Sequence, residues 1–372
     1  MKLALQIALN PSTEQRLLLL DVMASFNAAA TDAASVGAAL GVSSAFAIHR
    51  LCYARLRTQY GLSAQLAVRA IRKAAGVLAR DRRVAPVFRP TSSTCYDERS
   101  FSFKGDAFAS ILTRSGRTLV PLNIGDYQRE RWHLVRNCVD LIYREGAFYL
   151  DACIEVPESA PVTVSGFVGV DMGVVNLATT SDGETFVGDR VDVVRAHCHL
   201  RRQRLNREAT RQQKRGKRPR GVRRAQQRLG RKEARFRAHE NHCISKKIVG
   251  LAQDTKRGIA VEDLTHIRAR IRFAKAQRAR MGGWAFGQLQ GHLAYKAKRA
   301  GIPFVMVNAA YTSQTCHACG HCDRENRPDQ ATFACAACGH SAHADVNAAQ
   351  NIGARAVIVP PKVSDSPQRI AA

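Results

Sequence analysis

The sequence predicts a mixed α/β protein of two or three domains, and three features of its 372 residues lead to that prediction. Helical periodicity dominates residues 10–84, whereas residues 85–160 contain prolines and short β-type runs. Residues 162–307 then alternate short apolar strands with helices, the order typical of a mixed sheet. A cysteine-rich insert follows. We therefore expect a helical segment, a small β-domain such as a barrel, and a mixed sheet carrying a metal-binding insert.

The charge balance indicates a polyanionic partner. Lys and Arg number 57 and Asp and Glu number 30, so the formal net charge is +27 at pH 7. Nucleic acid relieves such self-repulsion, and an anionic membrane surface is the alternative. No apolar run approaches the roughly 18 residues of a membrane-spanning helix, and residues 1–10 lack the cleavage site of a secretory signal. We therefore expect nucleic-acid partners, no membrane partner and a cytoplasmic location.

In the N-terminal part, turn residues and the spacing of apolar residues predict the strands and helices. Residues 1–9 alternate like a short strand, and Asn10-Pro11 predicts a helix start with Asn10 as the cap. Residues Val139 to Val156 predict a hairpin with its turn at Glu145-Gly146. Before the hairpin, one helix is expected to bury an apolar stripe on one face: Ala64, Ala67, Ile71, Ala74 and Leu78.

The C-terminal part contains short strands and long helices. The predicted strands are Val162–Asp171, Asn176–Ser181, Glu184–Val187, Gly258–Glu262 and Pro303–Val307. Predicted helices span Trp284–Ala300 and the region around Val346–Ile352. The tail from residue 360 is polar, and we expect it to be loose.

A basic block separates the first three of these strands from the fourth. Residues 195–237 contain eighteen Lys and Arg against only Glu208 and Glu233, which is typical of a polyanion-binding surface. Glycine and proline at 216–221 predict two helices joined by a turn. A seven-residue spacing predicts a buried seam on the second helix: Val222, Leu229, Phe236 and Cys243. We expect nine cations to contact nucleic acid: Arg201, Arg204, Lys214, Arg215, Lys217, Arg218, Arg220, Arg223 and Arg224.

Two matched CxxCG motifs predict a structural zinc site. The pairs Cys316/Cys319 and Cys335/Cys338 are separated by 15 residues, a spacing that suits four thiolates around one Zn²⁺. The glycine after each pair allows the positive φ that such a turn favours. Cys322 stays open as a replacement for Cys319, and three histidines are spare donors: His317, His321 and His340. The 11 cysteines are an odd number, which favours buried thiols and one metal cluster over disulfides.

Three acids stand at the ends of predicted elements. Asp171 and Glu262 each end an apolar strand, and Asp345 opens the helix after the cysteine motifs. Each alone is most simply a cap or turn residue, with Asp345 stabilised by its helix dipole. Together they can meet at one edge of a sheet and hold two divalent metals about 3.5–4 Å apart for phosphodiester cleavage. Carboxylate oxygens suit Mg²⁺ or Mn²⁺ rather than zinc.

These motifs resemble the TnpB (OrfB) proteins carried by insertion sequences. Residues Gly169–Ala178 resemble the first RuvC motif of that family, and Val261–Leu264 resembles the second. Residues from Trp284 to Lys296 are similar to the family's helix between motifs two and three. Three stretches resemble the family's third motif with its inserted ribbon: Tyr311–Gly320, Cys335–Gly339 and Ala344–Ile352. The resemblance is close over about residues 160–355 and loose over residues 1–160.

The resemblance implies a fold, an activity and partners. The fold would be a RuvC/RNase H-like mixed sheet with an inserted zinc ribbon, an N-terminal helical recognition segment and a small β-barrel (wedge) domain. Asp171, Glu262 and Asp345 would bind two Mg²⁺ or Mn²⁺ ions and hydrolyse DNA. A guide RNA transcribed from or near the protein's own locus would pair with one strand of a double-stranded DNA target beside a short motif. We expect a monomer in that complex.

The expected domains follow the same resemblance. Their boundaries are residues 1–9 and 85–160 for the wedge, 10–84 for the recognition helices, 161–312 and 342–358 for the nuclease with its basic hairpin at 193–254, 313–341 for a zinc ribbon that binds target nucleic acid, and 359–372 for a flexible tail.

One departure from the family pattern leaves the origin of the chain open. Many members have Asp-Arg-Asp where this sequence has His343-Ala344-Asp345, and the related miniature type V CRISPR effectors often carry Ala there. The acids are intact, but the phosphate contact of the missing arginine is called into question. The sequence therefore does not separate a transposon-borne protein from a CRISPR-associated one.

Three other functions fit the sequence less well than a guided nuclease. A guided DNA-binding repressor that no longer cuts would not need all three acids. A transposase proper fits less well, because the ribbon and the glutamate as second acid match the nuclease pattern and no separate helix-turn-helix is evident. An RNA-binding zinc protein would not need acids on strand ends.

Overall fold

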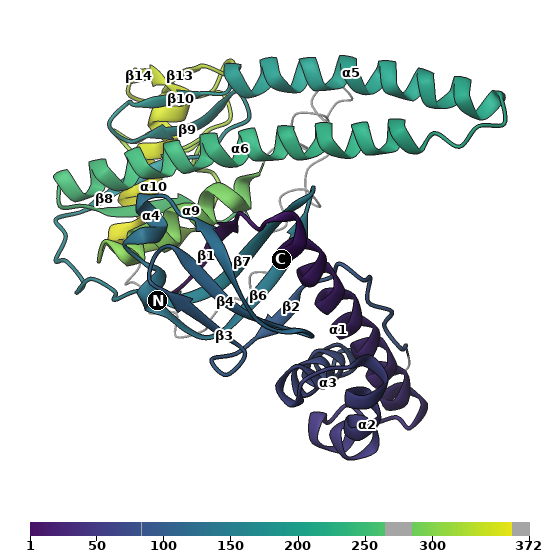
Figure 1. The fold of residues 1–372 in the computed structure, drawn as a ribbon. Coiled ribbons are helices and arrows are strands. Elements are labelled where there is room, and N and C mark those ends of the chain that lie inside the picture. The colour runs from purple at the N-terminus through teal and green to yellow at the C-terminus, as the bar shows by residue number, and fades with distance from the viewer. Residues whose placement is uncertain (83, 265–284, 359–372) are drawn as a thin grey trace. The chain divides into compact units, whose positions relative to one another are not determined.

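The computed structural model describes residues 1–82, 84–264 and 285–358 (Figure 1). The chain divides into two compact units, Met1–Pro157 and Glu158–Ala372. The predicted loose tail and Trp284, the expected first residue of one helix, lie outside the described residues.

Three helices pack together in the first unit: α1 (Thr13–Ala39), α2 (Ala45–Tyr60) and α3 (Ala64–Leu78). Helix α1 begins after Ser12, whose hydroxyl accepts a hydrogen bond from the Gln15 amide at 3.2 Å while the Gln15 side chain accepts one from the Ser12 amide at 3.0 Å. Ser12 is therefore the cap, with both hydrogen bonds of a capping box, and the expected cap at Asn10 was wrong. The apolar stripe on α3 is confirmed except at Ala64, which is exposed.

Helix α1 corrects the expectation that no apolar run approaches membrane-spanning length. By length and composition it could cross a membrane, with an 18-residue window of mean hydropathy 1.3, of which half is buried inside the unit. Val22, Phe26 and Ala30 are fully buried and belong to the same hydrophobic core as Leu66 of α3. Packing in this core accounts for the apolar composition of the helix.

A seven-stranded antiparallel sheet forms the rest of the first unit, in the order β2-β6-β7-β1-β5-β4-β3. The central strand β1 (Lys2–Leu9) pairs with β7 (Ala147–Glu155) and β5 (Gly116–Asn123). The predicted hairpin is confirmed as β6 (Val135–Arg144) and β7, and its turn residues Glu145 and Gly146 both have positive φ. The remaining elements are β2 (Thr94–Tyr96), β3 (Phe101–Lys104), β4 (Phe108–Thr113), α4 (Asp126–Arg129) and η1 (Trp132–Leu134).

The second unit is built on a five-stranded mixed sheet in the order β10-β9-β8-β11-β12. Strands β8 (Phe167–Asp171), β11 (Gly258–Glu262) and β12 (Phe304–Val307) are parallel, whereas β9 (Asn176–Thr180) and β10 (Thr185–Val187) are antiparallel. All five predicted strands are present. The first is shorter than expected, because residues 162–166 make only scattered backbone hydrogen bonds to 256, 258 and 301.

The two faces of this sheet are covered by different helices. Helices α6 (Arg220–Asp254) and α9 (Phe286–Arg299) pack on the face that carries Val168, Val170, Ile259 and Val261. Helix α10 (Ala344–Ile358) packs on the other face, against Ala260, Val305 and Val307. Since side chains alternate along a strand, Asp171 and Glu262 fall on the α10 face, at the carboxyl ends of adjacent parallel strands.

A glycine lets α10 lie close against β8. A Cβ atom on Gly169 would stand 1.8 Å from the Ala349 carbonyl oxygen and 2.5 Å from the Gly353 nitrogen. The backbone of β8 therefore contacts the backbone of α10 directly, which only glycine at 169 permits. This approach fixes the helix, and with it Asp345 one turn before Ala349.

The basic block forms two long antiparallel helices, α5 (Asp189–Lys214) and α6, as predicted (Figure 1). Gly216 stands in the turn between them with φ +69°. Val222 and Leu229 are buried and Phe236 is partly buried, but Cys243 is exposed, so the seam prediction was wrong at its last position. A straight helix drifts by about 20° per heptad, and after three heptads the buried face has moved to Ile244.

Candidate active site and metal centre

The three predicted acids meet in one cavity of about 500 Å³. Asp171 is the last residue of β8 and Glu262 the last of β11, whereas Asp345 is the second residue of α10. Glu262 is buried with 8% of its surface exposed, and the other two are partly buried. Arg327, from the cysteine-rich insert, also lines the cavity. Strand ends, the close-packed helix and the insert thus contribute together to one polar hollow.

Neighbouring side chains orient two of the three carboxylates. The Asn176 amide donates to Asp345 Oδ2 at 2.8 Å, and Arg327 Nη2 lies 3.5 Å from Asp345 Oδ1. The Thr312 hydroxyl hydrogen-bonds Glu262 Oε1 and also lies 3.1 Å from the Ala309 carbonyl oxygen. These contacts restrict the rotamers of Glu262 and Asp345.

The carboxylates also repel one another. Burial, together with the charges of Glu262 and Asp345, raises the pKa of Asp171 to about 8, and the charge of Arg327 opposes this rise. Burial likewise raises the pKa of Glu262, opposed by the Thr312 hydrogen bond and the charge of Arg355. Among the described residues, the three crowded acids outnumber the two arginines whose charges act on them, Arg327 and Arg355. A bound cation would restore the balance, and the donors are hard oxygens of the kind that Mg²⁺ and Mn²⁺ prefer.

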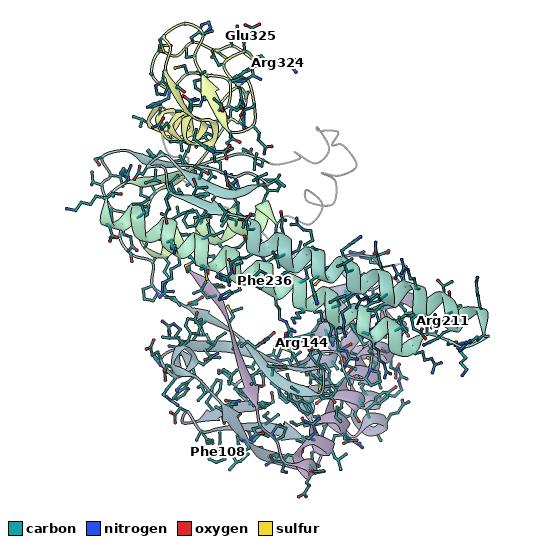
Figure 2. All side chains as sticks on the ribbon, turned by 90° about the horizontal axis from the view of Figure 1, so that it is seen from above. Phe108, Arg144, Arg211, Phe236, Arg324 and Glu325 are labelled. Carbon is teal, nitrogen blue, oxygen red and sulfur yellow. The ribbon has the colours of Figure 1, made fainter. Side chains whose placement is uncertain are left out.

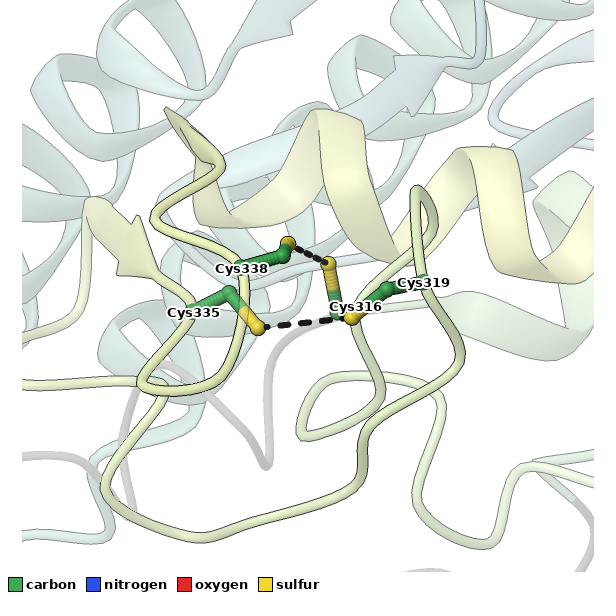
Figure 3. Close-up of side chains that lie close together, drawn as sticks. All are labelled: Cys316, Cys319, Cys335 and Cys338. Carbon is green, nitrogen blue, oxygen red and sulfur yellow. Dashed lines mark hydrogen bonds between the residues drawn. The ribbon is translucent and has the colours of Figure 1, made fainter.

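A second group of ligand-type atoms is the predicted cysteine cluster. The Sγ atoms of Cys316, Cys319, Cys335 and Cys338 all lie within 4.8 Å of one another, and Figure 3 shows them converging. Sγ of Cys316 is 3.7 Å from Sγ of Cys338, and Sγ of Cys319 is 3.6 Å from Sγ of Cys335. A tetrahedron with Zn–S bonds of about 2.3 Å has edges of roughly 3.8 Å. The cluster therefore fits a four-thiolate metal site, and Cys322 is not part of it.

The two halves of this cluster have the same backbone. In the first knuckle the Gly320 amide donates to the Cys316 carbonyl at 2.9 Å, and in the second the Gly339 amide donates to the Cys335 carbonyl at 3.0 Å. Gly320 and Gly339 have φ of +78° and +72°, as the motif predicted. The short strands β13 (Thr332–Ala334) and β14 (Ser341–His343) complete this insert.

Asn326 joins the two knuckles and was not singled out from the sequence. It is fully buried, and its amide nitrogen donates to the carbonyls of Gln314 at 2.9 Å and His321 at 3.2 Å. Its side-chain oxygen accepts from the Ala336 amide at 3.0 Å. The next residue, Arg327, is the one that reaches the carboxylates, whereas Arg324 and Glu325 are exposed on the insert (Figure 2).

The nine predicted nucleic-acid contacts do not line the carboxylate cavity. They lie along α5, its turn and the start of α6, and all nine are exposed. Figure 2 labels Arg211 near the turn end of this hairpin. Glu233 pairs with Arg202 and Glu208 with Arg211, so two of the hairpin's few acids are already bonded to other arginines. The hairpin is thus a solvent-facing cationic surface.

Two family models match the second unit and its neighbouring residues. Residues 151–268 match a family described as a probable transposase (OrfB, IS605 type), and residues 286–352 match the TNB domain of Cas12f1-like proteins.

Curated relatives agree with these matches. Over 123 residues the chain is 42% identical to the CRISPR-associated endodeoxyribonuclease Cas12f1 of Sulfoacidibacillus thermotolerans, covering 32% of this chain and 28% of the relative. Over 223 residues it is 33% identical to the putative RNA-guided DNA endonuclease InsQ of Escherichia coli K12, covering 56% of this chain and 53% of the relative. The aligned stretches thus span about half, or less, of these relatives.

The fold as a whole is also found among solved structures. A Cas12f1 chain, solved by cryo-electron microscopy in a complex with sgRNA and target DNA, superposes with a TM-score of 0.66. The superposition covers 95% of this chain and 98% of that chain at 13% sequence identity. The two chains therefore share a fold.

Proposed function

We propose that this chain, which is related to the TnpB (OrfB) proteins of insertion sequences and to the Cas12f nucleases, is an RNA-guided DNA endonuclease. The observation that carries the proposal is the meeting of Asp171, Glu262 and Asp345 in one cavity of a chain with net charge +27. In such a complex, base pairing with a guide RNA recognises the DNA sequence. The protein supplies positive charge, recognises the shape of the duplex and cleaves the DNA.

The nuclease domain of the proposal is RuvC-like and comprises residues 161–312 and 342–358. Its support is a mixed sheet with acids at the carboxyl ends of β8 and β11 and a third acid from the helix packed on the same face. The same arrangement supports a site open to an extended substrate, since the cavity lies at a sheet edge rather than inside the core.

The three acids would hold two Mg²⁺ or Mn²⁺ ions. When bound, such ions activate water and stabilise the charge of a leaving phosphodiester oxygen. Glu262 is held for this task by Thr312, and Asp345 by Asn176. The arginine missing from position 344 has a counterpart in Arg327, whose guanidinium reaches the same cavity and can donate to a phosphate.

The cysteine cluster would hold one structural Zn²⁺. Four thiolates close the coordination sphere, so this ion would support the fold of residues 313–341 and leave chemistry to the carboxylates. We further propose that this ribbon binds the target nucleic acid.

The remaining regions would bind nucleic acid. The exposed cations of the α5–α6 hairpin would follow a phosphate backbone, and residues 10–84 and the seven-stranded sheet (residues 1–9 and 85–160) would recognise RNA and the target-adjacent motif. The expected complex holds one protein monomer with guide RNA and double-stranded DNA, in the cytoplasm.

Salt dependence tests the hairpin assignment. Replacing both Lys217 and Arg218 by alanine should weaken binding at all DNA and RNA sequences. It should also reduce the slope of log affinity against log salt by about 2, because each phosphate contact that forms releases about 0.9 counterions and two such contacts are lost. The measurement is RNA and DNA binding between low and physiological salt. An unchanged slope would remove the hairpin turn from the binding surface.

Guided cleavage tests the function itself. The protein is purified from cells that carry its native locus, the bound RNA is sequenced, and Mg²⁺-dependent cutting of DNA that matches the RNA's variable end is measured. The Asp171→Ala variant should keep the RNA and lose cutting, whereas Glu184→Ala, which changes an exposed acid in the same unit, should cut like the wild type. Guided binding without any cutting by the wild type would support a repressor, and no specific RNA would favour a transposase.

A further inference from the structure

The cysteine cluster and the carboxylate cavity share a boundary at the first residues of α10. Ala344 is fully buried and belongs to one small core with Cys316, Phe333 and Cys335. Its amide also donates to the Ala331 carbonyl at 2.7 Å. The next residue is Asp345, so one end of a cavity acid is fixed to the packed interior of the ribbon.

A buried amide one turn into α10 bonds the first cysteine knuckle directly. Asn347 is fully buried; its Oδ1 accepts from the His317 amide at 2.9 Å, and its Nδ2 donates to the Thr315 carbonyl at 2.8 Å. Thr315 immediately precedes Cys316, and His317 lies between the two cysteines of that knuckle. Both polar atoms of this side chain are therefore hydrogen-bonded to the backbone of the first cysteine knuckle.

The next turn of the helix continues the connection to Glu262. Asn351 Nδ2 donates to the Thr315 carbonyl at 2.7 Å and to the Thr312 carbonyl at 2.9 Å. The hydroxyl of the same Thr312 bonds Glu262 Oε1. A continuous set of hydrogen bonds thus runs from the knuckle through α10 to a second cavity acid.

The ribbon also supplies the cavity's arginine. Arg327 follows Asn326, the buried residue that bonds both knuckles, and its guanidinium lies 3.5 Å from Asp345 Oδ1. Order in the ribbon therefore determines where this positive charge stands. Arg327 is therefore positioned by the cysteine insert, and Asp345 and Glu262 are connected to the insert through α10 and Thr312, whereas Asp171 is the last residue of β8.

We infer that the cysteine cluster and the carboxylate cavity are energetically coupled metal sites, and that Asn347 and Asn351 are the positioning residues that couple them. The inference rests on the proposed function, in which both sites bind metal. A knuckle ordered by its metal holds both asparagine amides and so fixes Asp345 and Thr312. Supporting residues of this kind change metal affinity by about 10–100-fold. Coupling of binding free energies is reciprocal, so occupation of the cavity must also raise the zinc affinity of the ribbon.

The test uses the full-length zinc-loaded protein without nucleic acid. Mn²⁺ binding is measured by electron paramagnetic resonance of the free ion for the wild type, Asn347→Ala, Asn351→Ala and Asn241→Ala. Asn241 is the matched control, because it is a buried amide of α6 that bonds Gln288 Oε1 at 3.0 Å and touches neither site. We expect Mn²⁺ affinity to fall about 10–100-fold in the first two variants and to stay within about twofold of wild type in the control.

Reciprocity supplies a second readout that needs no variant to fold. Zinc affinity is measured at equilibrium by competition with a zinc-selective chelator, with and without saturating Mg²⁺. The affinity should rise several-fold with Mg²⁺ in the wild type and Asn241→Ala, and much less in Asn347→Ala. Wild-type Mn²⁺ binding with a zinc affinity indifferent to Mg²⁺ overturns the coupling alone, and so does wild-type Mn²⁺ affinity in both α10 variants. A wild-type protein that binds no Mn²⁺ overturns the coupling together with the proposed function.

Discussion

The cysteine cluster and the carboxylate cavity differ in how much of the fold each requires. The cluster is made by two local turns between Cys316 and Cys338, each closed by its own hydrogen bonds and glycine. The cavity needs β8, β11 and α10, which are far apart in the chain, to be packed correctly at the same time. Local sites of soft sulfur ligands can be read from spacing, whereas sites of hard oxygen ligands at strand ends depend on tertiary packing.

Loss of one cysteine should have the largest effect on stability. Cys335→Ser leaves only three thiolates in the cluster and places a polar hydroxyl in the small core of the ribbon. The protein should therefore release its zinc, and the second unit should melt at a markedly lower temperature. Structural zinc sites contribute on the order of 10 kcal/mol to the folding of small zinc domains. Metal content by mass spectrometry and thermal melting check this. Cys322→Ser, an exposed thiol outside the cluster, is the control, and equal losses in both variants would contradict the ligand assignment.

Gly169→Ala should disturb the cavity and also weaken the ribbon, because Asn347 and Asn351 connect α10 to the first cysteine knuckle. The added Cβ would meet the Ala349 carbonyl at 1.8 Å, so α10 must shift, at a cost of about 1–3 kcal/mol or more. We expect lower thermal stability, a large loss of cleavage and a lower affinity for zinc. Gly166→Ala, where no atom lies within 4 Å of the added Cβ, should be close to neutral. A Gly169→Ala protein with wild-type cleavage would show that α10 does not set the cavity.

Arg327→Gln should separate metal binding from cleavage. The substitution removes the positive charge beside Asp345 and keeps a polar side chain of similar reach. Divalent metal affinity should not weaken, since a competing cation is lost. Cleavage should fall by about 10²–10³-fold, as when one charge-stabilising donor is removed from an active site. Parallel Mn²⁺ binding and single-turnover cleavage measure this, and weaker Mn²⁺ binding would assign Arg327 to metal-site geometry instead.

The smallest expected effect is electrostatic and is seen only without metal. The pKa of Asp171 is raised from 3.8 to about 8, so the folded state favours the protonated form. Its contribution to stability is therefore present at low pH and is lost as pH rises towards and through 8. The asparagine of Asp171→Asn cannot ionise, so this variant should show a smaller fall in melting temperature between pH 5 and pH 8.5 than the wild type. The difference should be about 2–4 °C for each kcal/mol of unfolding free energy that the wild type loses on ionising Asp171. Chelator-treated protein is melted across that range, and identical profiles would mean that Asp171 is not crowded by its neighbours.

Much of the second unit could be predicted because its signals are local. The strands β9, β10, β11 and β12 follow apolar runs bounded by turn residues, and the hairpin turn follows from glycine and proline. Asp171, Glu262 and Asp345 could be named because each ends or begins such an element, and the family resemblance grouped them. Their meeting in one cavity was an expectation that needed the register of β8 with β11 and the position of α10.

The residues that support the site could not be predicted in the same way. Arg327 is an ordinary arginine in a loop, and its contact with Asp345 exists only after the ribbon folds against α10. Asn347 and Asn351 did leave a signal, because two asparagines spaced one turn apart stand among the alanines of a mainly apolar helix. The capping of α1 by Ser12 rather than Asn10, and the exposure of Cys243, were missed because side-chain bonding and helix drift decided them.

The central claim is that an RNA-programmed cut is made by the acids of this cavity. The most direct measurement is Mg²⁺-dependent cleavage of a matched DNA by the protein with the RNA from its own locus, compared with the same complex carrying Asp345→Ala. We predict cutting at the matched DNA, none at an unmatched DNA, and a loss of at least about 10³-fold in the variant with RNA binding unchanged. Cutting by Asp345→Ala at the wild-type rate, or cutting that ignores the RNA, would contradict the account.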